Sequence, residues 1–140
     1  MKSIFILALS LSCAATAALA NPANDIMSER NAEFFEAVNA ADADAVAGFY
    51  TEDAKIGPPG EGIISGREAI AEYWDSILGK EIAAARHVPG DYEMPSEDMI
   101  VEMSGYELLD ADGNVMGGGR AILTWRKVDG EWMITRDLWN

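Results

Sequence analysis

The stretch Leu123-Thr-Trp-Arg-Lys-Val-Asp-Gly-Glu-Trp-Met-Ile-Thr-Arg-Asp-Leu-Trp-Asn140 has the pattern of a β-hairpin and runs to the last residue. An Asp-Gly pair between two runs of β-branched and aromatic residues is a strong hairpin signal. The second run carries one carboxylate, Asp137, two residues away from both Thr135 and Trp139. Side chains alternate along a strand, so these three are expected on one face. If that face looks into a cavity, Asp137 is the best candidate for a reactive group.

The turn permits two pairings of these strands. A two-residue loop, 129–130, would place Ile122 opposite Asp137. A three-residue loop, 128–130, with a left-handed glycine and a bulge, would place Ala121 opposite Asp137. A one-residue slip moves side chains to the other face of the sheet, so the choice matters. We expect the three-residue loop, because it gathers an apolar face around Asp137, formed by Leu123, Trp125, Met133 and Trp139.

Helical patterns come first along the chain, and strand patterns follow. Helices are expected over residues 24–41, 42–50 and 65–78, the second capped by Asp42 and the third opened by a Ser65–Glu68 capping box. Strands are expected over 54–56, 63–64, 81–93 with a bulge at Pro89-Gly90, 99–109, 115–126 and 132–139. This order predicts an α+β fold with an antiparallel sheet.

The first twenty residues have the features of a secretory signal peptide. Lys2 precedes an apolar run that ends at Ala18-Leu19-Ala20, a small-residue cleavage site. We expect a signal peptide over 1–20, one domain over 21–140, and a periplasmic or secreted protein. Acylation of Cys13 is a less favoured alternative, because a lipobox requires leucine where Ser10 stands.

Composition argues against several classes of partner and cofactor. The net charge of −14 disfavours nucleic acids and anionic membranes, and no segment after residue 20 is apolar enough to span a bilayer. With one histidine and no cysteine after Cys13, a zinc site is not expected. The 110–114 segment lacks the spacing of a calcium loop. The run 117–119 of three glycines is expected to permit close backbone approach rather than phosphate binding. No cofactor or metal is expected.

A second set of polar side chains alternates on the 99–109 strand. Glu102, Ser104 and Tyr106 share one face, and this face could line the same cavity as Asp137. Two carboxylates in one low-dielectric pocket would raise at least one pKa, as general acid–base chemistry near neutral pH requires. The alternative places Glu102 in solvent or beside an arginine. His87 is expected to make a local hydrogen bond, because nothing in the sequence places it near either carboxylate.

Phe49-Tyr-Thr-Glu-Asp-Ala54, Gly57-Pro-Pro-Gly60, Gly66-Arg-Glu-Ala-Ile70 and the closing hairpin resemble the nuclear transport factor 2-like superfamily, in particular its SnoaL-like and ketosteroid-isomerase-like branches. The resemblance covers residues 28–140. It implies a cone of three helices against a curved antiparallel sheet, a pocket in the concavity, and commonly a homodimer across the sheet. It also implies that the residues expected on the Asp137 and Glu102 faces point into the cone.

The same resemblance shows where the chain departs from ketosteroid isomerases. Their catalytic aspartate, tyrosine donor and aspartate donor correspond here to Pro58, Phe34 and Leu123. Without a base or an oxyanion donor at these positions, that isomerisation is not expected.

Three functions are compatible with these features. The first is an exported domain that binds a small apolar or amphipathic molecule in a pocket with Asp137 and Glu102 as polar anchors. This pocket would also be lined by Tyr50, Trp74, Ser104, Leu123, Trp125, Met133, Thr135 and Trp139. The second is a cofactor-free isomerase, cyclase or hydratase with Asp137 as general base and Glu102 or Tyr106 as acid. The third is a dimerisation or interaction module.

Overall fold

The computed structural model describes residues 21–140 as helices packed on one curved sheet. In chain order the elements are α1 (Pro22–Asn39), α2 (Ala43–Ala47), β1 (Tyr50–Gly57), β2 (Ile64–Ser65), α3 (Arg67–Ile77), β3 (Ala84–Ser96), β4 (Met99–Leu109), β5 (Val115–Val128) and β6 (Glu131–Trp139). The expected signal peptide and Cys13 lie outside the described residues. The α+β class and the order of elements match the sequence-based expectation.

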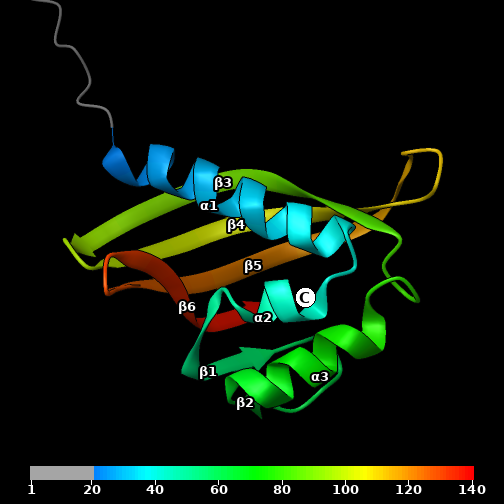
Figure 1. Cartoon of the computed structure of the whole chain (residues 1–140). Coiled ribbons are helices and arrows are strands. Elements are labelled where there is room, and N and C mark those ends of the chain that lie inside the picture. The colour runs from blue at the N-terminus through cyan, green and yellow to red at the C-terminus, as the bar shows by residue number, and fades with distance from the viewer. Residues whose placement is uncertain (1–20) are drawn as a thin grey trace, which may run out of the picture.

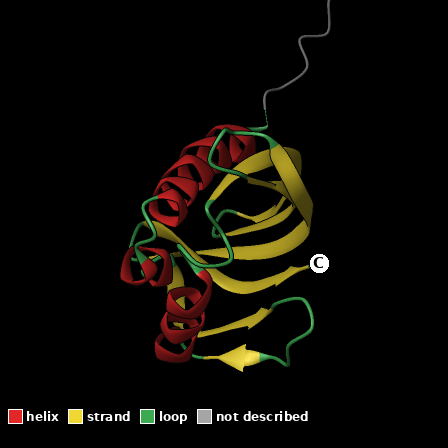
Figure 2. Cartoon of the chain, turned by 90° about the vertical axis from the view of Figure 1, so that its right-hand side faces the viewer, coloured by secondary structure: helices red, strands yellow, loops and turns green. Residues whose placement is uncertain are grey.

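The sheet has the strand order β2-β1-β6-β5-β4-β3. The closing strand β6 is therefore central: it pairs antiparallel with β5 and parallel with β1. Figure 1 shows α1 lying across the long strands β3 and β4, with α3 beside β1 and β2. Figure 2 shows the sheet curving around the space that the helices cover. The result is a cone with its apolar side chains turned inward.

The helices follow from their local sequences, with one exception. Asn21 caps α1 by accepting a hydrogen bond from the Ala23 amide, and Asp42 caps α2 through the Ala45 amide at 2.9 Å. The capping box expected at Ser65 is wrong. The cap of α3 is Gly66, with φ of 93° and no side-chain hydrogen bond, because Ser65 is the last residue of β2.

The expected three-residue hairpin loop is wrong as well. Val128 pairs with Glu131, so the loop holds only Asp129 and Gly130, with φ of 51° and 90°. Two successive positive φ angles are characteristic of the two-residue turn whose twist matches that of the flanking strands. This local preference outweighs the grouping of apolar side chains on which the longer loop was based.

A bulge further along β6 restores the inward position of Asp137. Trp125 pairs with Ile134, whereas Thr124 pairs with Arg136, so Thr135 is the extra residue. Its hydroxyl donates to the Thr124 carbonyl at 3.2 Å. A one-residue bulge reverses the alternation of faces, so that Ile134 and Asp137, three residues apart, are both buried. Asp137 therefore lies opposite Leu123, which neither of the two expected pairings allowed.

Glycines permit close approach between strands, as expected. A Cβ at Gly118 would collide with the Tyr106 carbonyl oxygen, and one at Gly90 would collide with the Met103 carbonyl oxygen. The register of β3 shifts between Val88 and Asp91, which confirms the bulge expected at Pro89-Gly90. These irregularities accompany the curvature that turns β3, β4 and β5 around the core.

Candidate functional site

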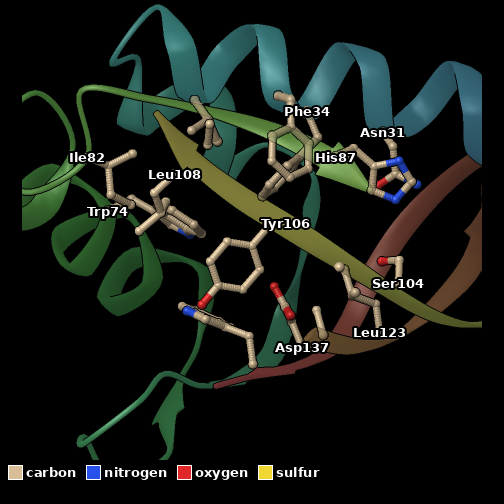
Figure 3. A pocket seen from close by; sticks show the side chains of 16 residues that line it. Asn31, Phe34, Trp74, Ile82, His87, Ser104, Tyr106, Leu108, Leu123 and Asp137 are labelled. Carbon is tan, nitrogen blue, oxygen red and sulfur yellow. The ribbon is translucent and has the colours of Figure 1, made fainter. Parts of the chain in front are cut away.

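A pocket lies inside the cone, between α1 and the concave face of the sheet. It contains about 610 Å³ of empty space, counted out into the solvent at its open mouth. Its walls are mostly apolar and include aromatic side chains from α1, α3 and β6 (Figure 3). The lining residues with polar side chains are Asn31, Trp74, His87, Ser104, Tyr106, Asp137 and Trp139. Such a mixture is typical of sites for small organic molecules.

Asp137 supplies the one carboxylate of the pocket lining. Its side chain projects from β6 toward the space below Tyr106 (Figure 3), and the residue is 4% exposed. The Tyr50 hydroxyl donates to Oδ2 at 2.7 Å. Among residues 21–140, Oδ1 has no hydrogen-bond partner. One oxygen is thus fixed by the protein, and the other is available to a ligand.

Burial raises the pKa of Asp137 to about 7. The Tyr50 hydrogen bond acts in the opposite direction, because it stabilises the carboxylate, and the negative charge of Glu102 raises the pKa further. The pKa of Tyr50 is in turn raised well above its usual value by burial and by the adjacent Asp137. At neutral pH Asp137 therefore exchanges readily between its neutral and charged forms, as proton transfer requires.

Trp74 lies close to this pair. Its indole nitrogen makes no hydrogen bond of normal geometry with residues 21–140, yet it is near enough to the Tyr50 hydroxyl to lower the pKa of that group. The hydrogen bond that fixes the Tyr50 hydroxyl within residues 21–140 is therefore the one to Asp137.

Glu102 is completely buried and has hydrogen bonds to both of its oxygens. Oε1 accepts from Asn31 Nδ2 at 3.0 Å and lies 3.0 Å from His87 Nε2, while Oε2 accepts from Trp125 Nε1 at 2.8 Å. These partners come from α1, β3 and β5. The expectation of a solvent-exposed Glu102, or one beside an arginine, is therefore wrong, and the carboxylate has no oxygen left for a ligand.

The expected site residues divide into two groups. Tyr106 and Asp137 line the pocket, as do Trp74, Ser104, Leu123 and Trp139. Five others do not: Tyr50, Glu102, Trp125, Met133 and Thr135. Of these, Tyr50 contacts Asp137 from behind, Trp125 contacts Glu102, and Thr135 forms the bulge. Met133 pairs with the exposed Arg126, so it lies on the face opposite Trp125 and its expected inward position is wrong.

The acid role expected for Glu102 or Tyr106 does not fit this geometry. Glu102 does not reach the pocket lining, and the Tyr106 hydroxyl donates its proton to the Asn140 carbonyl at 2.6 Å. The positions that correspond to the ketosteroid isomerase residues supply no acid–base group. Phe34 and Leu123 line the pocket as apolar side chains, and Pro58 is buried outside it.

Sequence reasoning missed the α1 and β3 side of the pocket. Asn31 of α1 lines the pocket, and its amide donates to Glu102. His87 packs its ring on Phe35, with centroids 5.8 Å apart. From β3, its Nε2 atom contacts Oε1 of Glu102 on the neighbouring strand β4. Asn31 follows the helical spacing of the apolar residues Met27 and Phe34. A polar residue on this buried face could have indicated a polar partner inside the cone.

Two further properties hold for residues 21–140. No three potential ligands among histidine, cysteine, aspartate and glutamate side chains come together as a metal site. No helix of this part of the chain has the length and apolarity needed to cross a membrane.

The buried Glu102 network leads to a prediction for stability. Glu102→Leu should lower the free energy of unfolding by about 3–5 kcal/mol, because it leaves the Asn31 and Trp125 donors buried without an acceptor. Urea denaturation measures the loss. Glu107→Leu on the same strand removes only a partly exposed pair with Arg86 and should cost less than about 1 kcal/mol. Equal losses for the two variants would contradict the assigned role of Glu102.

Asp137→Asn should change how stability depends on pH. The folded-state pKa of about 7 lies above the usual aspartate pKa of 3.8, so the folded state holds this proton more tightly than the unfolded state. The neutral Asp137 carboxyl contributes to the free energy of unfolding in full at any pH below the pKa that Asp137 has in the unfolded state. This contribution is lost as pH rises through the folded-state pKa of about 7. The isosteric amide of Asn does not ionise, so the variant does not lose stability in this way. The stability of the variant relative to the wild type should therefore rise by roughly 2–3 kcal/mol from about pH 5 to pH 8.

Urea titrations of both proteins across this range measure that difference. Parallel curves would show that Asp137 does not titrate as its burial requires. Asp98→Asn, which alters an exposed carboxylate, should show no such rise and serves as the control.

Known proteins share this architecture. An NTF-2-like protein of unknown function from Shewanella oneidensis MR-1 is 22% identical, with a TM-score of 0.70 over 84% of this chain and 98% of that chain. A ketosteroid isomerase-like protein from Erwinia carotovora atroseptica SCRI1043 is 23% identical, with a TM-score of 0.71 over 86% and 96%. A putative calcium/calmodulin-dependent protein kinase II association domain from Xanthomonas campestris is 20% identical, with a TM-score of 0.70 over 89% and 91%. At this level of identity, the likeness shows the fold.

A search among curated proteins finds no match. The sequence itself matches a family of domains over residues 32–134, which includes α1 from its middle and the sheet as far as β6. The matched segment covers most of the chain and contains Glu102, while Asp137 lies three residues beyond its end. The chain belongs to the family of SnoaL-like domains, within the nuclear transport factor 2-like superfamily.

Proposed function

We propose that this protein binds a small apolar or amphipathic molecule in the pocket between α1 and the sheet. The observation that carries the proposal is the open carboxylate oxygen of Asp137 at the wall of a largely apolar pocket of about 610 Å³. Apolar walls give a ligand its affinity through buried area, and a few polar atoms fix its orientation. A buried polar atom without a protein partner is costly unless water or a ligand completes it.

Filling the pocket should prevent binding. Leu108 lines it and is partly buried, so Leu108→Trp should occupy ligand space without disturbing the fully buried core. We expect the affinity for the neutral apolar dye Nile red, measured by fluorescence titration, to fall at least about tenfold. The neighbouring Leu109 is not part of the lining, so Leu109→Trp is the matched control and should bind like the wild type. Unchanged binding by Leu108→Trp would place the dye elsewhere.

A second candidate function is proton transfer, as in isomerases, cyclases or hydratases that use no cofactor. It is favoured by the position of Asp137, whose Oδ1 lacks a protein partner and whose pKa is raised to about 7 by burial. A carboxylate with these properties can remove a proton from a carbon next to a carbonyl group and return one to it. Tyr50 would hold the carboxylate in position through Oδ2.

Deuterium exchange tests this candidate without a known substrate. Cyclic ketones incubated with the protein in D₂O should gain deuterium next to the carbonyl, and mass spectrometry measures the gain. Asp137→Asn should reduce the rate by at least about a hundredfold, because the amide cannot accept the proton. Asp98→Asn should exchange like the wild type. An active Asp137→Asn variant, or no exchange by any protein, would leave ligand binding as the function.

We also propose that residues 1–20 are removed as a signal peptide and that 21–140 act as one domain outside the cytoplasm. The cleavage signal after Ala20 and the structural role of Asn21 support this. Asn21 caps α1 and donates to the Tyr92 carbonyl at 2.8 Å, so a chain starting there begins with an anchored residue. The intact mass of the protein recovered from a periplasmic extract tests the cleavage site. A mass that includes residues 1–20 would contradict it.

We propose further that two copies of the chain associate through the outer face of the sheet. Met103, Ile122 and Leu138 are each 41–53% exposed and lie side by side on β4, β5 and β6. Exposed apolar patches of this kind are typical of interaction surfaces. Ile122→Glu should convert a dimer to a monomer in analytical ultracentrifugation, whereas Val115→Glu, at the exposed start of β5, should not. A wild-type monomer at micromolar concentration would overturn the proposal.

A further inference from the structure

The pocket contains a carboxylate but no positive side chain. Its lining includes Asp137 and no lysine or arginine, and among residues 21–140 Asp137 has no ion-pair partner. Two of the arginines make contacts elsewhere: Arg30 lies over the ring of Phe49, and Arg126 pairs with Asp98. A buried carboxylate is ordinarily balanced by a cation or by several donors. Within residues 21–140 the Tyr50 hydroxyl is the single hydrogen-bond donor to Asp137.

Aromatic side chains line the pocket together with this carboxylate. Trp74 and Trp139 stack with centroids 5.8 Å apart and ring planes inclined by 15°, and Phe34 meets Trp74 edge-on at 5.9 Å. All three line the pocket, and Trp139 follows Asp137 by two residues on the same face of β6. Figure 3 shows Asp137, Tyr106 and Trp74 grouped around one space. The faces of aromatic rings attract cations, most strongly in places that water does not reach.

The negative charge of the rest of the molecule also favours a cationic ligand. Glu102 is a second buried carboxylate close enough to influence Asp137, and the chain carries a net charge of −14. A cationic ligand is attracted by this field, whereas an anionic one is repelled and would meet no positive group in the pocket. A neutral alcohol could hydrogen-bond to Asp137 but would gain neither the charge interaction nor the aromatic contact.

We propose that the pocket selects a small lipophilic amine, whose ammonium group pairs with Asp137 Oδ1 while its apolar body packs against Trp74, Trp139 and Phe34. This deepens the proposed function and rests on it. The ammonium supplies the missing counter-charge, and the aromatic walls bind the remainder. Asn31 of α1, His87 of β3 and Ser104 of β4 are the other polar groups of the lining, for polar atoms elsewhere on the ligand.

Amine binding should release protons at neutral pH. An ammonium beside Asp137 favours its charged form, so a carboxyl that is partly protonated in the free protein ionises on binding. Other titratable groups face this site from every side: Tyr50 on β1, Tyr73 on α3, His87 on β3, and Glu102 and Tyr106 on β4. Asp137→Asn separates the contribution of Asp137 from theirs.

Three ligands with the same indole body test the proposal. Isothermal titration calorimetry at pH 7 compares tryptamine, tryptophol and indoleacetate, which carry an ammonium, a hydroxyl and a carboxylate. We expect tryptamine to bind at least about tenfold more tightly than tryptophol, and indoleacetate to show no binding. Repeating the tryptamine titration in buffers with different ionisation enthalpies should reveal proton release. Asp137→Asn should lose both the preference for tryptamine and the proton release.

Controls separate this proposal from the proposed function and from attraction to the acidic surface. Asp98→Asn should retain the preference, and Leu108→Trp should weaken tryptamine and Nile red alike. The amine proposal would be overturned, and the pocket left in place, if tryptophol bound with the same affinity as tryptamine. The same conclusion would follow if Nile red bound and tryptamine did not. Tryptamine binding that Asp137→Asn leaves unchanged would also overturn it. Failure of Nile red and all three indoles would overturn the pocket itself.

Discussion

The buried carboxylate of Glu102 is the interaction on which the arrangement of the cone depends. It accepts hydrogen bonds from Asn31 on α1 and Trp125 on β5 and meets His87 of β3, so one side chain on β4 connects a helix to three adjacent strands. An ionised group deprived of water requires such donors. Because they come from different elements, α1 is fixed over the sheet at the distance that leaves the pocket open.

The two buried carboxylates differ in what the fold leaves available to a ligand. Glu102 has both oxygens engaged and lies outside the pocket lining, so it serves the structure. Asp137 has one oxygen held by Tyr50 and the other open to the pocket, with its pKa raised to about 7 by burial. The same chemical group thus stabilises the fold in one place and, we propose, meets the ligand in the other. The difference between the two roles is whether both oxygens of the carboxylate already have hydrogen-bond partners in the protein.

The strands β4 and β6 show which structural features could be predicted from the local sequence. The β4 strand was predicted with its observed ends, and its alternation correctly placed Glu102 and Ser104 on one face, because the side chains of a regular strand alternate strictly. The alternation alone did not decide whether that face was buried or in solvent. On β6 the inward position of Asp137 was predicted, but through the wrong register. The turn follows its own dihedral preference, and the bulge at Thr135 then compensates. Such a bulge depends on the partner strand and has no unique local signature.

The sequence by itself determined the α+β class, the order of elements and the acidity, because these follow from periodicity, turn chemistry and composition. The family was indicated separately, by the resemblance of its motifs. Only the tertiary structure decided that His87 and Asn31 meet Glu102, that Tyr50 holds Asp137 from behind, and that Asp137 keeps an open oxygen. These contacts join residues between 15 and 87 positions apart. Contacts over such separations depend on the curvature of the sheet and the packing of helices upon it, which no local pattern encodes.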